Sequence, residues 1–178
     1  IPKQGRVYEE FKLYHLNCEF GTISELCHDL LDYAKYYTDI VFKRNDDVEL
    51  RKLYGDIVDL RMEVSYPFLL KLHHDCCEKV ISKDELKEIL RLCISYVLRR
   101  GICDIPTNSM NKTFATFKNF IRQDDYLNSV KAHFILQDTY KEFPDDGKFG
   151  AAFVSRDIYN MRVRNYILTR LENYDNKA

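Results

Sequence analysis

Two short stretches of the sequence combine residue types that bind metal ions. Glu25 and His28 stand three residues apart, which places a carboxylate and an imidazole on one helix face. Di-metal carboxylate sites need two such motifs and two further carboxylates, and only this one occurs. His73 lies one helical turn from Cys76 and Cys77, but a tetrahedral zinc site needs a second closely spaced ligand pair. We therefore expect that Glu25 and His28 are a chance surface pair. We expect the stretch from His73 to Cys77 to be a helix whose thiols point inward and whose histidines lie at the rim of the core. Neither a metal nor a cofactor is expected.

No pattern typical of nucleophilic catalysis is present. The sequence lacks a Gly-x-Ser-x-Gly elbow, and the stretch Gly147 to Gly150 is too short to hold phosphate. Asp56 and Asp59 fit a solvated helix face. Asp145 and Asp146 fit the amino end of a helix, where negative charge is favourable. We interpret the six cysteines as reduced and mostly buried thiols; they are Cys18, Cys27, Cys76, Cys77, Cys93 and Cys103. The sequence thus predicts a domain that is not an enzyme.

Cations of the later half are the best candidates for binding a partner. Arg99 and Arg100 fall in the last turn of a predicted helix, where positive charge stabilises the helix dipole by about 0.3 to 1 kcal/mol. Alternatively, one of them makes a forked pair with a carboxylate such as Asp104, Asp145 or Asp146, or with a following domain. The candidates for contact with DNA or a flanking domain are Arg99, Arg100, Lys112, Lys118, Arg122, Arg162 and Arg164.

Charge is balanced over the whole chain but uneven along it. The 27 Lys and Arg against 28 Asp and Glu give a net charge of -1, which argues against a strongly basic nucleic-acid module. Residues 24–63 hold 6 basic and 10 acidic residues, a balance of -4, whereas residues 99–122 hold 5 basic and 1 acidic residue, a balance of +4. The later segment is therefore the one expected to face phosphate or an acidic partner.

Helical periodicity dominates the elements that must position these residues. Ser82 and Glu85 form a capping box that opens a helix predicted to stop at Gly101. Pro67 suits the first turn of an earlier helix. Further helices are expected at about residues 109–121, 125–137, 146–154 and 157–174. Because no useful alternating run appears, we expect one all-α, bundle-like domain over residues 1–178 with little or no sheet.

The inward positions of these patterns give the predicted core: Leu30, Leu53, Ile57, Leu86, Leu90, Cys93, Val97, Phe114, Phe117, Ile167 and Leu171. No apolar run approaches the length of about 18 residues that a membrane helix needs. The first residues also lack the apolar stretch of a secretory signal. We therefore expect a soluble cytoplasmic protein without a membrane partner.

Three segments of the later half carry a pattern that resembles a known family. They are Tyr96-Val-Leu-Arg-Arg-Gly-Ile-Cys-Asp-Ile-Pro-Thr-Asn-Ser-Met-Asn-Lys-Thr-Phe114, Phe143-Pro-Asp-Asp-Gly-Lys-Phe149 and Ile158-Tyr-Asn-Met-Arg-Val-Arg-Asn-Tyr-Ile-Leu-Thr-Arg-Leu-Glu172. This order of segments resembles the helical middle of the GmrSD family, which comprises modification-dependent DNA restriction endonucleases. The likeness covers Leu86 to Asn173, with a weaker echo at residues 7–12.

The resemblance implies that this chain is part of a longer protein. In the family, a ParB-like nucleotide-hydrolysing domain precedes this region and a His-Asn-His nuclease domain follows it. Their Asp-Gly-Gln-Gln-Arg and Glu-His-Ile-x-Pro motifs are absent here, so no catalytic residue is carried over. Phe143-Pro144 also departs from the Trp-Pro that is frequent in the family. Because the chain starts at Ile1 without a Met and stops at Ala178, we expect an internal fragment whose partners are the flanking domains of its own chain.

Three functions follow as hypotheses. The first is a non-catalytic connector that orients the two active domains of a DNA-targeting nuclease. The second is a module that itself grips DNA through the basic later half. The third is a small helical metalloprotein that uses Glu25 and His28 or the stretch from His73 to Cys77.

Overall fold

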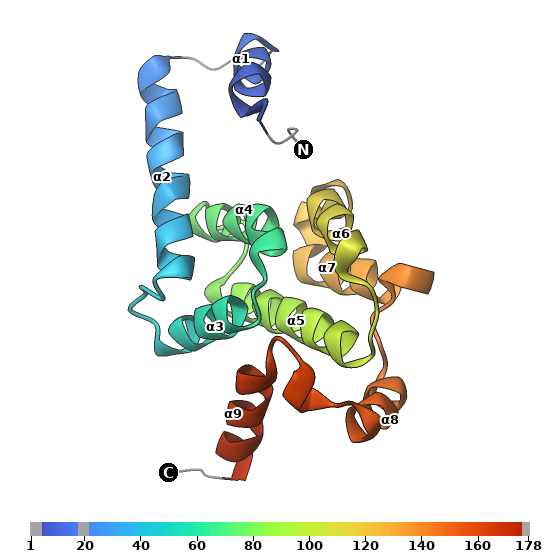
Figure 1. Ribbon diagram of the computed structural model, residues 1–178. Helices are drawn as coiled ribbons and strands as arrows, with labels where there is room; N and C mark the ends of the chain where they lie inside the picture. The colour runs from blue at the N-terminus through green and yellow to red at the C-terminus, as the bar shows by residue number, and fades with distance from the viewer. Residues whose placement is uncertain (1–4, 18–21, 176–178) are drawn as a thin grey trace.

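The computed structural model describes residues 5–17 and 22–175, and within these ranges every regular element is a helix (Figure 1). The α-helices are α1 (Val7–Asn17), α2 (Ile23–Val41), α3 (Val48–Asp59), α4 (Tyr66–Cys77), α5 (Lys83–Ile102), α6 (Met110–Thr116), α7 (Tyr126–Ile135), α8 (Asp146–Ser155) and α9 (Arg164–Asp175). Short 3-10 helices join them: η1 (Glu63–Ser65), η2 (Thr107–Ser109), η3 (Phe117–Asn119), η4 (Gln123–Asp125), η5 (Thr139–Lys141) and η6 (Ile158–Asn160). No strand occurs in the described residues, and the predicted all-α fold is confirmed. No helix among them is long and apolar enough to cross a membrane.

The central element is α5. Helices α3, α4, α7 and α8 all pack against it, while α2 packs against α3 and α4 at the outside (Figure 1). Leu86, Leu90 and Cys93 are fully buried, as predicted, and Ile89 and Tyr96, each one turn away on the same face, are buried as well. Asp84 and Arg91 on the opposite side of the helix are exposed. A wide apolar stripe must be covered by neighbouring elements, which explains why several helices pack on this face of α5.

Aromatic rings form the core between α5 and the later helices. Phe68 of α4 stacks on Phe117 at 4.4 Å between ring centroids, and Phe117 contacts Phe134 of α7 at 4.8 Å. Tyr96 reaches Phe134 at 4.9 Å and Phe114 at 6.2 Å. Edge and offset contacts of this kind add stabilisation beyond that of the buried area alone. The cluster fixes α4, α6 and α7 around the carboxyl half of α5.

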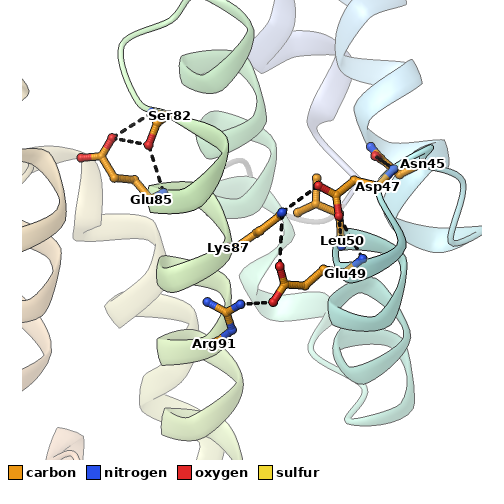
Figure 2. A network of polar contacts seen from close by, with 8 residues as sticks. All are labelled: Asn45, Asp47, Glu49, Leu50, Ser82, Glu85, Lys87 and Arg91. Atoms are coloured by element: carbon orange, nitrogen blue, oxygen red, sulfur yellow. Dashed lines mark hydrogen bonds and ion pairs between the residues drawn. The ribbon is translucent and has the colours of Figure 1, made fainter.

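A charged network joins the first turns of α3 and α5 (Figure 2). Ser82 and Glu85 form the predicted capping box at the start of α5. One turn later, the Lys87 ammonium lies 2.7 Å from Asp47 and 3.2 Å from Glu49, and Arg91 also pairs with Glu49. The hydrogen bond from Lys87 holds the pKa of Asp47 below its usual value. Because Asp47 is also the N-cap of α3, this network sets the place of α3 on α5.

Four helices end in the same turn with a residue other than glycine in the left-handed conformation. Lys43, Arg61, Lys79 and Asp104 have φ of 56°, 55°, 60° and 58° and follow the C-caps of α2, α3, α4 and α5. In each turn the next residue's N–H bonds the carbonyl five residues back, as in a Schellman motif. Side chains with a Cβ usually avoid this conformation because it costs about 1 to 2 kcal/mol.

The predicted stop at Gly101 is therefore wrong. Helix α5 continues through Gly101 to Ile102, and Asp104 makes the left-handed turn. Ile102 is 1% exposed, so its burial favours the extra turn, and a Cβ on Gly101 would lie in ordinary contact with the Met161 side chain, 3.9 Å away. The helix predicted at 109–121 is also shorter, since α6 ends at Thr116 and continues only as η3. The helix predicted at 157–174 begins at Arg164.

Two members of the predicted core lie on the surface. Leu30 is 54% exposed and Leu171 is 48% exposed, whereas Val97 is half-buried and the other eight are buried. The amino-terminal end of α2 projects beyond α4 in Figure 1, and Ile40, near the other end of the helix, is the one buried residue of α2. Leu171 lies on the exposed second half of α9. Helical spacing identified an apolar stripe in both places, but no neighbouring helix covers it in the described part of the chain.

Candidate functional site

Glu25 and His28 have local structural roles at the start of α2. The Glu25 carboxylate accepts the Thr22 amide N–H at 2.7 Å, and the Thr22 hydroxyl accepts the Glu25 amide at 3.2 Å, which together make a capping box. The His28 Nδ1 lies 2.7 Å from the Ser24 carbonyl oxygen. Both side chains thus contact backbone groups at the amino end of α2. The expectation of a chance surface pair missed this capping box.

His73 lies in the core rather than at its rim. It is 7% exposed, its Nε2 is 3.0 Å from the Tyr54 hydroxyl, and its ring stacks on Tyr36 at 6.0 Å. Burial lowers the pKa of His73 to about 4. The thiol of Cys77 is exposed instead, so the predicted orientation of this helix is wrong for both residues. Among residues 5–17 and 22–175, no three His, Cys, Asp or Glu side chains are grouped closely enough to hold a metal ion.

The cysteines divide between core and surface. Cys93 is buried, which agrees with the prediction, and burial raises the pKa of its thiol. Cys76 and Cys103 are half-buried, whereas Cys27 is exposed like Cys77. Cys18 lies outside the described residues. The thiols that the structure describes are all free.

Arg99 ties the end of α5 to the start of α8. Its Nη1 donates to the Pro144 carbonyl at 2.9 Å, its Nη2 pairs with the Asp146 carboxylate, and its guanidinium lies 5.1 Å from the centre of the Phe149 ring. The predicted contact of Arg99 with a carboxylate is present, with Asp146 as the partner, but it is not forked, because the second branch of the guanidinium bonds the Pro144 carbonyl. Asp145 next to it is the N-cap of α8, as its place before that helix predicted.

Arg100 is completely buried and is therefore not available to DNA or to another domain. It donates to the Pro106 carbonyl at 2.6 Å, the Ser109 hydroxyl at 3.0 Å and the Tyr96 hydroxyl at 3.1 Å. It makes no ion pair with any residue that the structure describes, and its Nε has no hydrogen-bond partner there. Oxygen acceptors and the Tyr96 ring, 5.1 Å away, offset the cost of burying the charge. The Tyr96 hydroxyl in turn donates to the Lys141 carbonyl at 2.8 Å.

The other basic candidates do not form one surface. Arg122 pairs with Asp124 at 2.8 Å, and Arg164 donates to its neighbouring Tyr159 carbonyl at 3.2 Å. Lys112 on α6 and Lys118 on η3 are exposed, but α6 lies far from α9 in Figure 1. Residues 99–122, with their charge balance of +4, therefore do not form a single basic face. Arg99 and Arg100 make hydrogen bonds within the fold, and Arg122 is paired with Asp124. Arg99 and Arg100 are thus not free for DNA, whereas Lys112, Lys118 and Arg162 are exposed, and DNA contact by these three stays a prediction.

A groove of about 880 Å³ lies between α3 and α9. Four cations line it: Lys52, Arg61, Arg162 and Arg170. The first two come from residues 24–63, where acidic residues outnumber basic ones. Arg61 and Arg162 also line a second groove of about 810 Å³ beside the carboxyl end of α5. Sequence reasoning identified Arg162 alone. It missed Lys52 and Arg61 because the charge balance of a segment does not tell which of its residues share a surface.

The two acidic residues of this groove are both paired. Asp56 bonds to Arg170 at 2.7 Å and Asp59 lies 3.4 Å from the Lys43 ammonium. Burial raises the pKa of Asp56, which corrects the expectation that Asp56 lies on a solvated helix face. Comparison of the chain with protein-family models, with curated proteins and with solved structures finds no match.

Proposed function

We propose that this chain is a non-catalytic helical connector that orients the flanking nucleotide-hydrolysing and nuclease domains of a modification-dependent DNA restriction endonuclease. The proposal rests on the resemblance of residues 86–173 and on how the structure uses the reactive side chains. Arg99, Arg100 and His73 all hold helices together. Side chains with such roles stabilise a fold and are poorly placed to act on a substrate.

The observation that carries this proposal is the uncovered apolar face of α2. Ile23, Leu30 and Tyr37 follow one another at seven-residue steps, which places them on one face of the helix. They are 76%, 54% and 45% exposed. The neighbouring α1 likewise exposes Val7 and Leu16, at 63% and 78%. Apolar surface of this extent is characteristic of contacts between proteins or domains. In the proposed arrangement, the nucleotide-hydrolysing domain packs on this face.

A connector must also keep its two ends in a fixed relative orientation, and hydrogen bonds around α5 supply the necessary rigidity. Arg99 and Tyr96 hold α5 to the segment that leads into α8, and the Arg100 network holds the turn after α5. The projecting end of α2 and the helix α9 lie at opposite ends of this body in Figure 1. Domains attached to the two ends would therefore be separated by a well-packed spacer.

The proposal is tested by placing charge on the apolar face in the longer protein that contains this chain. Ile23→Glu together with Leu30→Glu should leave the unfolding free energy of the chain itself within about 0.5 kcal/mol, since both side chains are exposed. The same changes should reduce DNA cleavage by the longer protein at least tenfold, because they separate the two active domains. Nucleotide hydrolysis and cleavage are measured side by side.

The matched control is Ile135→Glu with Leu136→Glu, two exposed apolar residues at 76% and 80% exposure at the end of α7. This control should keep cleavage near the wild-type level. Equal cleavage by the α2 variant and the wild type would contradict the connector role. A reading frame around the chain that encodes neither a ParB-like nor a His-Asn-His nuclease domain would contradict it as well.

A further inference from the structure

The groove between α3 and α9 has an excess of positive charge that the fold does not use. Four cations line it: Lys52, Arg61, Arg162 and Arg170. Of these, Arg170 is paired with Asp56, and the other acid of the groove, Asp59, is paired with Lys43. Lys52, Arg61 and Arg162 are exposed and make no ion pair with any residue in the described ranges. Three full positive charges therefore face solvent across one groove.

Backbone charges neither add to this excess nor cancel it. Arg61 follows the carboxyl end of α3, where the helix dipole is equivalent to about -0.5 charge, and Arg162 precedes the amino end of α9, where it is about +0.5. The two ends line the same groove, so their contributions largely offset each other. The sign of the groove is therefore set by the three side chains.

Polar side chains of α9 in the lining supply hydrogen-bond donors. Asn165, Thr169 and Asn173 follow at four-residue steps along α9, and all three are exposed. A docked peptide is usually held by apolar anchors in well-formed pockets, whereas the apolar side chains of this lining are limited to Val58, Val163 and the buried Tyr166. Backbone phosphates, in contrast, are contacted by Arg and Lys together with Asn and Thr side chains. The composition of the groove thus favours phosphate over an acidic peptide.

We propose that the groove between α3 and α9 binds the sugar–phosphate backbone of nucleic acid through Lys52, Arg61 and Arg162. Asn165 and Thr169 donate hydrogen bonds to the same phosphates. This site differs from the basic later half of the sequence, because two of its three cations come from α3 and the turn after it. The inference does not depend on the connector role, since it concerns binding by the chain alone.

The conformation of Arg61 allows a test that does not endanger the fold. Arg61 has φ 55°, and glycine adopts this region without steric cost, so Arg61→Gly removes the cation at a position where glycine is favoured. It is combined with Arg162→Gln. The control combines Lys79→Gly, at the equivalent turn after α4 with φ 60°, and Lys118→Gln on η3. Both double variants lose two positive charges and gain one glycine in a left-handed turn.

Binding of a labelled 20-base-pair DNA duplex to each protein is measured between 50 and 200 mM salt. Three phosphate contacts predict that log K falls with log salt with a slope of about -2.7, a weakening of about fortyfold over this range. One remaining contact predicts a slope of about -0.9 and a weakening of about threefold to fourfold for the groove variant. The control should behave like the wild type.

Several results would overturn the proposal. Absence of duplex binding at 50 mM salt would do so, as would an equal loss of affinity in the control and the groove variant. A labelled polyglutamate peptide serves as the second probe; tighter binding of this peptide than of the duplex at the same salt would assign the groove to an acidic protein segment instead. Thermal unfolding of both double variants verifies that each remains folded, whichever result is obtained.

Discussion

The buried His73 should make the stability of this protein fall in mild acid. Burial lowers the pKa of His73 from 6.5 to about 4, because the imidazolium would lose its hydration in the core. Between these two values the unfolded chain binds a proton that the folded chain does not. The contribution of His73 to stability is therefore fully present above pH 6.5 and is lost as the pH falls toward 4. From pH 7.5 to pH 5.0 the linkage relation gives a loss of about 2 kcal/mol.

The assay is urea unfolding, followed by far-ultraviolet circular dichroism, at pH 7.5 and pH 5.0. Wild type is compared with His73→Gln, which removes the titrating group and keeps a polar atom near Tyr54. Desolvation by burial and the nearby Lys141 also lower the pKa of His133, so some acid sensitivity should persist in the variant. The difference between the two proteins isolates His73. His28→Gln, on the exposed face of α2, is the control and should keep the wild-type dependence.

Equal losses of unfolding free energy by His73→Gln and the wild type between the two pH values would show that His73 does not cause the acid sensitivity. That result would mean that the protonated imidazole finds compensation in the folded protein, for instance by local opening of α4 toward water. Whether the variant is less stable than the wild type at pH 7.5 does not affect this test, because only the change with pH is compared.

Two further predictions concern stability. Leu90→Ala should lower the unfolding free energy by about 2 to 5 kcal/mol, because Leu90 is fully buried on α5. Chemical denaturation measures this change. The control Leu136→Ala, at a surface position, should change the unfolding free energy by less than about 0.5 kcal/mol. Lys79→Gly should raise the unfolding free energy by about 0.5 to 1 kcal/mol, since it relieves the left-handed strain at the end of α4. A lower melting temperature for Lys79→Gly would show that contacts of the lysine side chain outweigh that strain.

Local features of this protein could be predicted from the sequence because they depend on residues close together in the chain. The Ser82 capping box needs only its own four residues, and the place of Pro67 in the first turn of α4 follows from the fixed φ of proline. The inward positions of α5 follow from helical spacing, so Leu86, Leu90 and Cys93 were assigned correctly. The same spacing failed for Leu30, because a stripe of apolar residues does not reveal whether another helix covers it.

Only the tertiary structure decided the use of the cations. Arg99 meets Asp146 across 47 positions of sequence, and the neighbouring Arg100 is buried among backbone carbonyls and hydroxyls of the turn that follows. Adjacent residues on a helix point about 100° apart, so two arginines side by side in sequence can have opposite roles. The groove between α3 and α9 brings Lys52 and Arg61 to Arg162 from the other end of the chain. The sequence by itself determined where the helices form and which faces are apolar, because these depend on local spacing; which charges remain free for a partner depends on packing between distant segments.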